Sequence, residues 1–369
     1  MTQFFETIKI GGRGDRKDAV LVGKGVPVVI QSMWKDKLTT ADLDGEAGVA
    51  LIDRIERLSR MGCGLLRFAV PDVEAAQILG RLTEMVSMPL VADIHFDYRI
   101  ALRCLDFPIA KIRINPGNIG EKANVEKVLE KAGAKSVPIR IGVNAGSLSH
   151  DLRFRVESGE IDRIEALLQS AERELAVFEA FRFSHVLVSV KTSGIADTIR
   201  ANRLLKQRTN VPLHVGVTEA GPLVAGTVRN AAALFTLLSE GIGDTVRTSL
   251  SDTVENEVIA AREIVNAVAE SREQKPQGVT VTSCPRCGRA SFDTHGFTRR
   301  WLTRLYTEHR SAAIAVMGCV VNGPGEARHA DLGITGAGDK VILFRRGKIV
   351  KTVAVSDADA AFAEELRNL

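Results

Sequence analysis

The feature that most constrains this chain is a regular alternation of short apolar strands and amphipathic helices over about the first 270 residues. Eight strands are predicted: Val28–Met33, Leu65–Val70, Leu90–His95, Ala110–Asn115, Ile139–Asn144, Val186–Lys191, Leu213–Thr218 and Asp244–Ser249. The predicted helices are Leu51–Met61, Val73–Met85, Arg163–Phe181, Ile195–Leu205, Val224–Ser239 and Glu255–Val268. Alternating elements form parallel βαβ units, and eight evenly sized units favour a closed (β/α)8 barrel over a doubly wound open sheet. The sequence therefore predicts an α/β protein built on a TIM barrel.

Alternate residues of a strand share a face, and polar residues mark the face of each predicted strand that lines the barrel. On the second to eighth strands this face carries Leu65, Arg67 and Ala69; Val91, Asp93 and His95; Lys111, Arg113 and Asn115; Arg140, Gly142 and Asn144; Leu187, Ser189 and Lys191; His214, Gly216 and Thr218; and Thr245, Arg247 and Ser249. Polar residues accumulate toward the carboxyl ends of these strands. Barrel enzymes assemble their active sites at that end, so we expect a site there.

Cations dominate this predicted site. They are Arg67, Arg113, Arg140, Lys191 and Arg247. The clearest acids are Asp93 and Glu219, and a lone residue such as His214 is equally well explained as a salt-bridged or solvated strand end. So many cations in one low-dielectric pocket repel each other unless an anion binds among them, and the planar guanidinium group suits phosphate. The set predicts a substrate with more than one phosphate charge.

A polar stretch with Pro and Gly, residues 271–278, follows the last barrel helix and is typical of a linker. We therefore predict a barrel domain at 1–270 and a small α/β domain at 279–369. The strands predicted in the second domain are Val279–Thr282, Ala313–Met317 and Val341–Phe344, and the helices are Thr298–Glu308 and Asp357–Leu366.

The chain has five cysteines, and an odd number excludes complete pairing into disulfides. This pattern favours a reducing compartment, so we expect a cytoplasmic protein. Cys63 and Cys104 have apolar neighbours and are predicted to be inert core thiols. The other three cysteines, Cys284, Cys287 and Cys319, all lie in the predicted second domain.

Two kinds of metal site remain open for these three cysteines. Cys284-Pro-Arg-Cys287-Gly is typical of a zinc knuckle, but zinc usually needs a second close pair of ligands. Here the second half offers only Cys319, in a loop rich in Gly and Pro. Three thiolates with an incomplete fourth position match an iron–sulfur cluster with a labile site. The fourth ligand could be Glu326, with three histidines as rivals: His295, His309 and His329.

Composition argues against two classes of partner. The net charge of +4 comes from interleaved acids and bases, and 14 Phe, 2 Trp and 2 Tyr provide few stacking platforms, so we expect no nucleic-acid partner. The longest apolar run, about Ala312 to Val321, is too short to cross a bilayer, and the N-terminus lacks an apolar signal core. We therefore expect no membrane partner either.

Seven segments of the chain resemble one enzyme family. They are Ala92–Arg99, Arg113–Gly120, Arg140–Ser147, Thr218–Gly221, Ser239–Ser249, Ser283–Cys287 and Gly318–Ala327. In this order they resemble the 4-hydroxy-3-methylbut-2-enyl diphosphate synthases of the non-mevalonate isoprenoid pathway, from about Val29 to Gly336. Two stretches depart from the family pattern: Trp34-Lys35-Asp36 replaces a Thr/Asn-rich turn, and Arg67-Phe68-Ala69 replaces Arg-Val-Ser.

The resemblance implies a barrel that binds 2-C-methyl-D-erythritol 2,4-cyclodiphosphate and a second domain that carries a [4Fe-4S] cluster. The family's cluster ligands correspond to Cys284, Cys287, Cys319 and Glu326. Its diphosphate-binding residues correspond to Arg67, Arg113, Arg140, Asn144, Lys191, Arg247 and Ser249, with Thr218 nearby and with Asp93 and His95 counted in the same site. Glu219 corresponds to an acid implicated in proton transfer.

The implied reaction is a reductive ring opening to (E)-4-hydroxy-3-methylbut-2-enyl diphosphate with loss of a hydroxyl as water. Flavodoxin or ferredoxin would supply two electrons, and a homodimer would place the cluster domain of one chain over the barrel of the other. Two alternatives stay open. One is a phosphosugar aldolase with a Schiff base on Lys191 and a structural zinc site, and the other is a zinc-ribbon module that binds nucleic acid.

Overall fold

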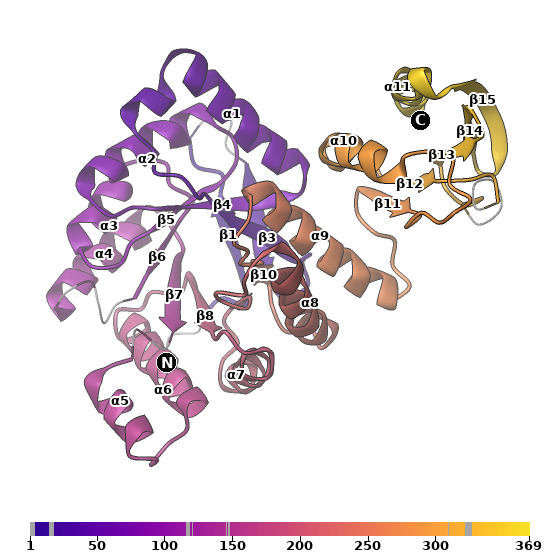
Figure 1. The fold of residues 1–369 in the computed structure, drawn as a ribbon. Helices are drawn as coiled ribbons and strands as arrows, with labels where there is room; N and C mark the ends of the chain where they lie inside the picture. The colour runs from indigo at the N-terminus through magenta and orange to yellow at the C-terminus, as the bar shows by residue number, and fades with distance from the viewer. Residues whose placement is uncertain are drawn as a thin grey trace. The chain divides into compact units, whose positions relative to one another are not determined.

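The computed structural model describes residues 4–14, 18–115, 119, 121–144, 146, 148–308, 310–321 and 327–369. The chain forms two compact units, Met1–Val268 and Ala269–Leu369 (Figure 1). The stretch predicted as a linker, residues 271–278, lies between a helix that ends at Ser271 and a strand that begins at Val279. In the part of the chain described here, no helix is both long enough and apolar enough to cross a membrane.

Eight parallel strands form the barrel, in the spatial order β8-β7-β6-β5-β4-β3-β10-β9. Their bounds are β3 (Val29–Met33), β4 (Cys63–Ala69), β5 (Leu90–Asp93), β6 (Lys111–Ile114), β7 (Ile139–Asn144), β8 (Val186–Lys191), β9 (His214–Val215) and β10 (Thr245–Val246). A parallel bridge between Val188 and Leu213 joins the two ends of this order. The predicted barrel is confirmed, although β9 and β10 are shorter than expected.

Helices surround these strands (Figure 1). Their bounds are α1 (Gly45–Arg60), α2 (Val73–Met85), α3 (Tyr98–Cys104), α4 (Lys122–Ala134), α5 (His150–Glu157), α6 (Arg163–Ala180), α7 (Ile195–Arg208), α8 (Leu223–Ser239) and α9 (Val254–Ser271). The sequence did not predict α3, α4 and α5. Two of these, α3 and α5, span only seven and eight residues, which is short for a recognisable apolar period.

An N-terminal hairpin that the sequence did not predict packs on the barrel. Its strands, β1 (Thr7–Gly11) and β2 (Ala19–Gly23), pair antiparallel. Ile8, Ile10 and Val22 are buried in one cluster with four barrel residues. Leu65, Val91 and Leu187 lie in the first half of their strands, and Ala110 comes just before β6. The hairpin therefore covers the amino-terminal end of the barrel, and the carboxyl ends of the strands are left for a site.

The second unit is a five-stranded sheet in the order β11-β12-β13-β14-β15 with two helices. Its bounds are β11 (Val279–Ser283), β12 (Ala312–Met317), β13 (Leu332–Ala337), β14 (Lys340–Arg345), β15 (Lys348–Ala354), α10 (Thr294–Tyr306) and α11 (Ala358–Arg367). The first three strands are parallel and the last two antiparallel. The small α/β unit was predicted, but β13 and β15 were not.

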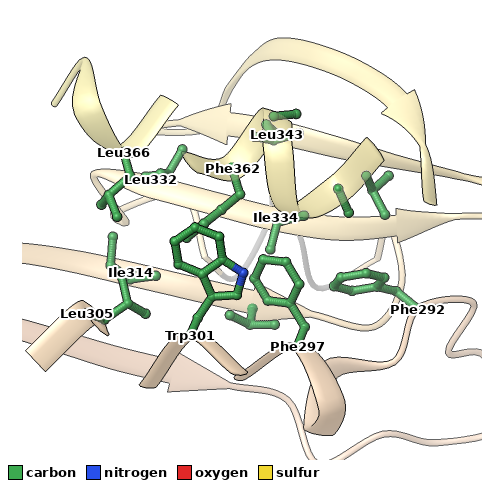
Figure 2. Close-up of a cluster of buried hydrophobic side chains, with 14 of the residues drawn as sticks. Phe292, Phe297, Trp301, Leu305, Ile314, Leu332, Ile334, Leu343, Phe362 and Leu366 are labelled. Atoms are coloured by element: carbon green, nitrogen blue, oxygen red, sulfur yellow. The ribbon is translucent and has the colours of Figure 1, made fainter. Parts of the chain in front are cut away.

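Aromatic side chains form the core of this second unit (Figure 2). Phe362 of α11 is fully buried and meets Phe297 and Trp301 of α10 edge-on, with ring centroids 5.1 Å and 4.8 Å away. The Trp301 indole donates a hydrogen bond to Asp359 Oδ1 at 2.6 Å, so the polar edge of the ring is satisfied. The two helices are therefore joined by this aromatic cluster.

Replacing Phe362 with alanine is expected to lower the free energy of unfolding of the second unit by about 3–5 kcal/mol, because the change leaves a cavity between α10 and α11. Trp301 lies in the same cluster, so its fluorescence during denaturant unfolding reports the loss. Phe154→Ala serves as the control, because that phenyl group is exposed on the barrel. A loss below about 1 kcal/mol would show that this packing is not what holds the unit together.

Candidate functional site

The carboxyl ends of the barrel strands enclose a cavity of about 150 Å³. The residues that line it are Arg67, Asp93, His95, Arg113, Arg140, Gly142, Val143, Asn144, Ser189, Lys191, Thr218, Arg247 and Ser249. All of them except Val143 belong to the strand face that residue alternation predicted. The structure therefore brings together every residue that was predicted to bind the substrate.

Arg113 lies across this cavity in a fixed position. One of its terminal nitrogens lies 3.2 Å from Asp93 Oδ1 and 2.6 Å from His95 Nε2, and the other donates to the Gly142 carbonyl at 3.2 Å. A Cβ atom at Gly142 would overlap the guanidinium group. The absence of a side chain on β7 at this point is thus what allows Arg113 to lie there.

Asp93 is the buried acid of the cavity, and it is shared between two arginines. Its carboxylate contacts Arg113 and also lies 3.5 Å from Arg67 Nε. Burial by itself would raise the pKa of Asp93, but the charges of Arg67 and Arg113 outweigh burial and hold that pKa below its usual value. Asp93 is therefore an anion that orients two of the cations.

Two of the other cations, Arg140 and Lys191, have less compensation. Arg140 is 2% exposed and donates to Ser189 Oγ at 2.8 Å, and among the described residues neither Arg140 nor Lys191 forms an ion pair. Burial, followed by the charges of neighbouring arginines, lowers the pKa of Arg140 and the pKa of Lys191 well below their usual values. A cavity with this surplus of positive charge favours an anionic ligand.

A second polar layer lies deeper in the barrel and does not line the cavity. Lys111 donates to Gln31 Oε1 at 2.9 Å, and His214 Nδ1 lies 2.7 Å from Thr245 Oγ1. Burial, together with the nearby charge of Lys191, lowers the pKa of His214 well below its usual value. His214 is thus a hydrogen-bonded residue of the barrel interior. It is fully buried, so its interpretation as a solvated strand end is wrong, and among the described residues it forms no ion pair.

Glu219 is not part of the cavity lining. It follows β9 with a φ of +52° and its side chain is exposed, whereas the neighbouring Thr218 lines the cavity. The structure therefore does not bring the predicted proton-transfer acid to the other site residues.

Sequence reasoning missed a second buried acid, Glu257 of α9. Its side chain is 1% exposed and pairs with Arg247 at 3.0 Å. A signal was present in the sequence: Glu257 stands between the buried residues Val254, Val258 and Ala261, on the apolar face of a predicted helix. An acid at such a position needs a buried cationic partner.

The two departures from the family pattern contact each other. The Trp34 ring stacks on Phe68, with centroids 5.6 Å apart, and the Arg54 guanidinium lies over the Trp34 ring at 4.7 Å. Next to this pair, Arg67 Nε donates to Met33 Sδ at 2.9 Å. Trp34 after β3 thus packs on Phe68 of β4, while Arg67 still lines the cavity.

The cysteines of the second unit follow two neighbouring parallel strands. Cys284 comes directly after β11, and Cys319 comes after β12, separated from it by Gly318. The Cys284 N–H donates to the Val316 carbonyl at 3.0 Å, and a Cβ atom at Gly318 would lie 3.3 Å from Cys284 Sγ. Both cysteines therefore lie at the carboxyl edge of the sheet, with Cys284 Sγ close to the backbone that precedes Cys319.

The remaining predicted ligands differ in how they are placed. Cys287 is an exposed free thiol three residues beyond Cys284. The imidazole groups of His295 and His329 are also exposed. Glu326, and its rival His309, lie outside the described residues. Among the side chains that the structure describes, no group of three or more His, Cys, Asp or Glu is arranged to hold a metal ion.

The donors at this edge nevertheless suit an iron–sulfur cluster. Cys284, Cys287 and Cys319 are all free, and two of them follow adjacent strands, so the backbone carries them to one place. Soft thiolates are the ligands that such clusters require. Cys63 and Cys104 differ: both are buried in the barrel unit, and burial raises the pKa of each thiol to about 12.

Comparison with known proteins agrees with this architecture. The family model described as the GcpE TIM-barrel domain matches residues 16–262, and the GcpE protein C-terminal domain matches residues 280–368. The chain is 48% identical to a protein of Treponema pallidum (98% of this chain, 91% of that protein) and 46% identical to one of Treponema denticola (98% of each). Both are named 4-hydroxy-3-methylbut-2-en-1-yl diphosphate synthase (flavodoxin).

Among solved structures, the chain is similar to dihydropteroate synthase of Xanthomonas albilineans, with 13% identity and a TM-score of 0.47 over 69% of this chain and 96% of that one. The two family matches together span most of the sequence. This chain belongs to the GcpE family.

Proposed function

We propose that this chain is an oxidoreductase that converts 2-C-methyl-D-erythritol 2,4-cyclodiphosphate to (E)-4-hydroxy-3-methylbut-2-enyl diphosphate. The observation that carries the proposal is the cluster of cations at the barrel mouth, in a chain whose relatives are named for that product. Arg140 and Lys191 lack carboxylate partners among the described residues, so a diphosphate would compensate charges that the protein leaves uncompensated.

The barrel residues bind and orient the substrate. Arg113 and Arg67, fixed by Asp93, present N–H groups to the phosphate oxygens, and Arg140 and Arg247 approach from other strands. When a ring C–O bond breaks, negative charge grows on the diphosphate oxygen that leaves. Cations held in place before the reaction stabilise that charge at no cost in reorganisation.

Cys284, Cys287 and Cys319, with Glu326, would hold a [4Fe-4S] cluster in the second unit. When bound, the cluster supplies the electrons for the reduction one at a time. The names of the relatives support flavodoxin as the donor in preference to ferredoxin. We further propose a cytoplasmic homodimer in which the barrel of one chain works with the second unit of the other.

Proton delivery by Glu219 is part of the same proposal. Its exposed side chain is four residues beyond the end of β9 and next to Thr218 of the cavity lining, and this nearness in the chain supports the role. The aldolase alternative has one feature in its favour, the lowered pKa of Lys191. The names of the relatives do not support it.

Turnover is the test of the proposed function. The anaerobically purified chain, given the cyclic diphosphate and reduced flavodoxin, is expected to form the linear diphosphate, identified by mass spectrometry. Reduced ferredoxin in a parallel reaction tests the choice of donor. If the chain formed no linear product with either donor while it contained a full complement of iron, the proposal would fail; trapping of substrate on Lys191 by borohydride would favour the aldolase.

Substrate binding is expected to take up protons. A bound anion raises the pKa of the groups beside it, and the pKa values of His95 and Lys191 are lowered here, chiefly by burial. The phosphates of the cyclic substrate do not change their charge near neutral pH, so affinity should rise as the pH falls from about 8 to about 6. Calorimetry in buffers of different ionisation enthalpy measures the uptake.

Lys191→Met is the matched variant for this measurement, because it removes one of the two groups and should reduce the uptake. Zero uptake by the unmodified chain, or an affinity that rises with pH, would contradict the assignment of these groups to the diphosphate site.

A further inference from the structure

One buried carboxylate on a helix pairs with a cation of the cavity and has no role in the proposed function. Glu257 belongs to the first turn of α9 and is 1% exposed. Its Oε1 atom accepts hydrogen bonds from Arg247 Nη2 at 3.0 Å, Lys35 Nζ at 2.6 Å and the Leu250 N–H at 3.0 Å. Its Oε2 atom accepts a hydrogen bond from Ser32 Oγ at 2.8 Å.

These contacts connect the segments at the carboxyl ends of two neighbouring barrel strands. Ser32 lies in β3 and Lys35 in the loop that follows β3. Arg247 comes directly after β10, and Leu250 follows three residues later. Strands β3 and β10 are neighbours in the sheet. Glu257 therefore fixes the loop after β3 and the segment after β10 relative to each other.

The carboxylate is charged in this position. Burial by itself would raise the pKa of Glu257, but the charge of Arg247 and the hydrogen bond from Lys35 outweigh burial and lower it. Arg247 lines the cavity, and Glu257 is its ion-pair partner in the described part of the chain. The direction of the Arg247 guanidinium group is thus set by a residue that does not itself line the cavity.

We propose that Glu257 is a positioning residue for substrate binding: it acts through Arg247, holding the guanidinium group toward the diphosphate and fixing the loop after β3. This proposal rests on the proposed function, because it assumes that the diphosphate binds at the barrel mouth. It concerns a residue that the sequence did not single out and that does not touch the substrate cavity.

The sign of one measurement separates positioning from simple charge balance. If Glu257 only reduced the positive potential of the cavity, its neutralisation would strengthen anion binding. If Glu257 positions Arg247, the same change weakens binding, because the guanidinium group loses its orientation. In Glu257→Gln the side-chain NH2 group, itself a donor, faces the groups that donate hydrogen bonds to the carboxylate. These hydrogen bonds are therefore lost while the volume of the side chain stays nearly the same.

The experiment compares the full chain, loaded with iron and sulfide, with its Glu257→Gln variant. We expect the KM and the Kd for the cyclic diphosphate to rise about 10-fold and kcat to change less than about 3-fold, because charge-assisted hydrogen bonds of this kind contribute mainly to binding. Glu255→Gln is the matched control: it lies in the same turn of α9 but pairs with Arg54, at 2.8 Å, instead of a cavity residue. This control variant should leave KM, Kd and kcat unchanged.

A double variant tests whether the effect passes through Arg247. In an Arg247→Gln background, Glu257→Gln should weaken binding by less than about 2-fold further, since the group that it positions is already gone. Glu257→Asp retains the charge and should bind the substrate more tightly than Glu257→Gln. It also keeps the test valid if Glu257→Gln does not fold, as judged by circular dichroism.

Tighter or unchanged binding by Glu257→Gln would overturn the proposal, and so would additive effects in the double variant. The failure of the proposed function looks different: in that case the unmodified chain itself would neither bind nor convert the cyclic diphosphate.

Discussion

Replacing Cys319 with serine is expected to remove most of the iron from the protein and to lower turnover more than about 100-fold, because loss of a ligand costs more than the loss of a residue that only supports one. Cys319 is buried, and its carbonyl accepts a hydrogen bond from Thr335 Oγ1 at 2.7 Å, so the backbone at this position is fixed. A serine oxygen would occupy the same place without the soft donor that iron–sulfur clusters require. Iron and sulfide per chain, measured anaerobically, give the result together with the rate.

The matched control is Cys63→Ser in the barrel. Cys63 is equally buried, and its thiol donates to the Leu65 carbonyl at 3.2 Å, a bond that a serine hydroxyl can also make. This variant should keep its iron and its activity. Retention of iron by Cys319→Ser, or equal loss from both variants, would contradict the proposed ligands.

Replacing Arg140 with methionine should have opposite effects on activity and stability. The change is expected to lower kcat/KM about 10²–10³-fold, since it removes a fixed donor to the charge that develops on the leaving diphosphate. It should also raise the free energy of unfolding without substrate by about 1 kcal/mol or more, because an apolar side chain of similar length replaces a buried charge. Arg140 is 2% exposed and pairs with no carboxylate among the described residues.

Arg113→Met is the contrasting variant for this prediction. It should lose a comparable amount of activity, but it should unfold more easily than Arg140→Met because Asp93 loses one of its two arginine partners. Thermal unfolding and substrate titrations on both variants measure the two quantities. Equal stability changes in the two variants would show that the cations of the cavity do not repel each other as proposed.

The position of the barrel-mouth residues was predictable because strands have a fixed period. Once a strand such as Lys111–Ile114 is identified, alternation decides which side chains enter the barrel, and the direction of the chain decides which lie at the carboxyl end. Arg67, Asp93 and Lys191 could therefore be placed together from sequence alone. This prediction needed only the alternation of side chains within each strand and the direction of the chain.

Residues outside the strands could not be placed in this way. Glu219 follows β9, and its positive φ turns the backbone so that the side chain is exposed. Glu257 pairs with the cavity residue Arg247 from a helix, and the sequence does not specify how α9 is rotated against β3 and β10. The pairing of Glu257 with Lys35, 222 positions away, depends on that rotation.

The strands that were missed lack the usual pattern of apolar residues. β13 contains Gly333 and Gly336, and glycines are typical of loops. The side chain of Phe344, on the neighbouring strand β14, covers Gly333. β15 is an edge strand with largely exposed side chains. The N-terminal hairpin is short and interrupted by glycines, and its burial comes from the barrel beneath it. In each case tertiary packing supplies what local sequence does not.

We propose that three cysteines of the second unit hold a redox cluster that serves a diphosphate site in the barrel. The most direct test is metal and sulfide analysis of the anaerobically purified chain, with its absorption spectrum. We expect about four iron and four sulfide per chain and a brown, air-sensitive protein. Stoichiometric zinc without sulfide would contradict the account, because zinc has no redox chemistry with which to reduce the substrate.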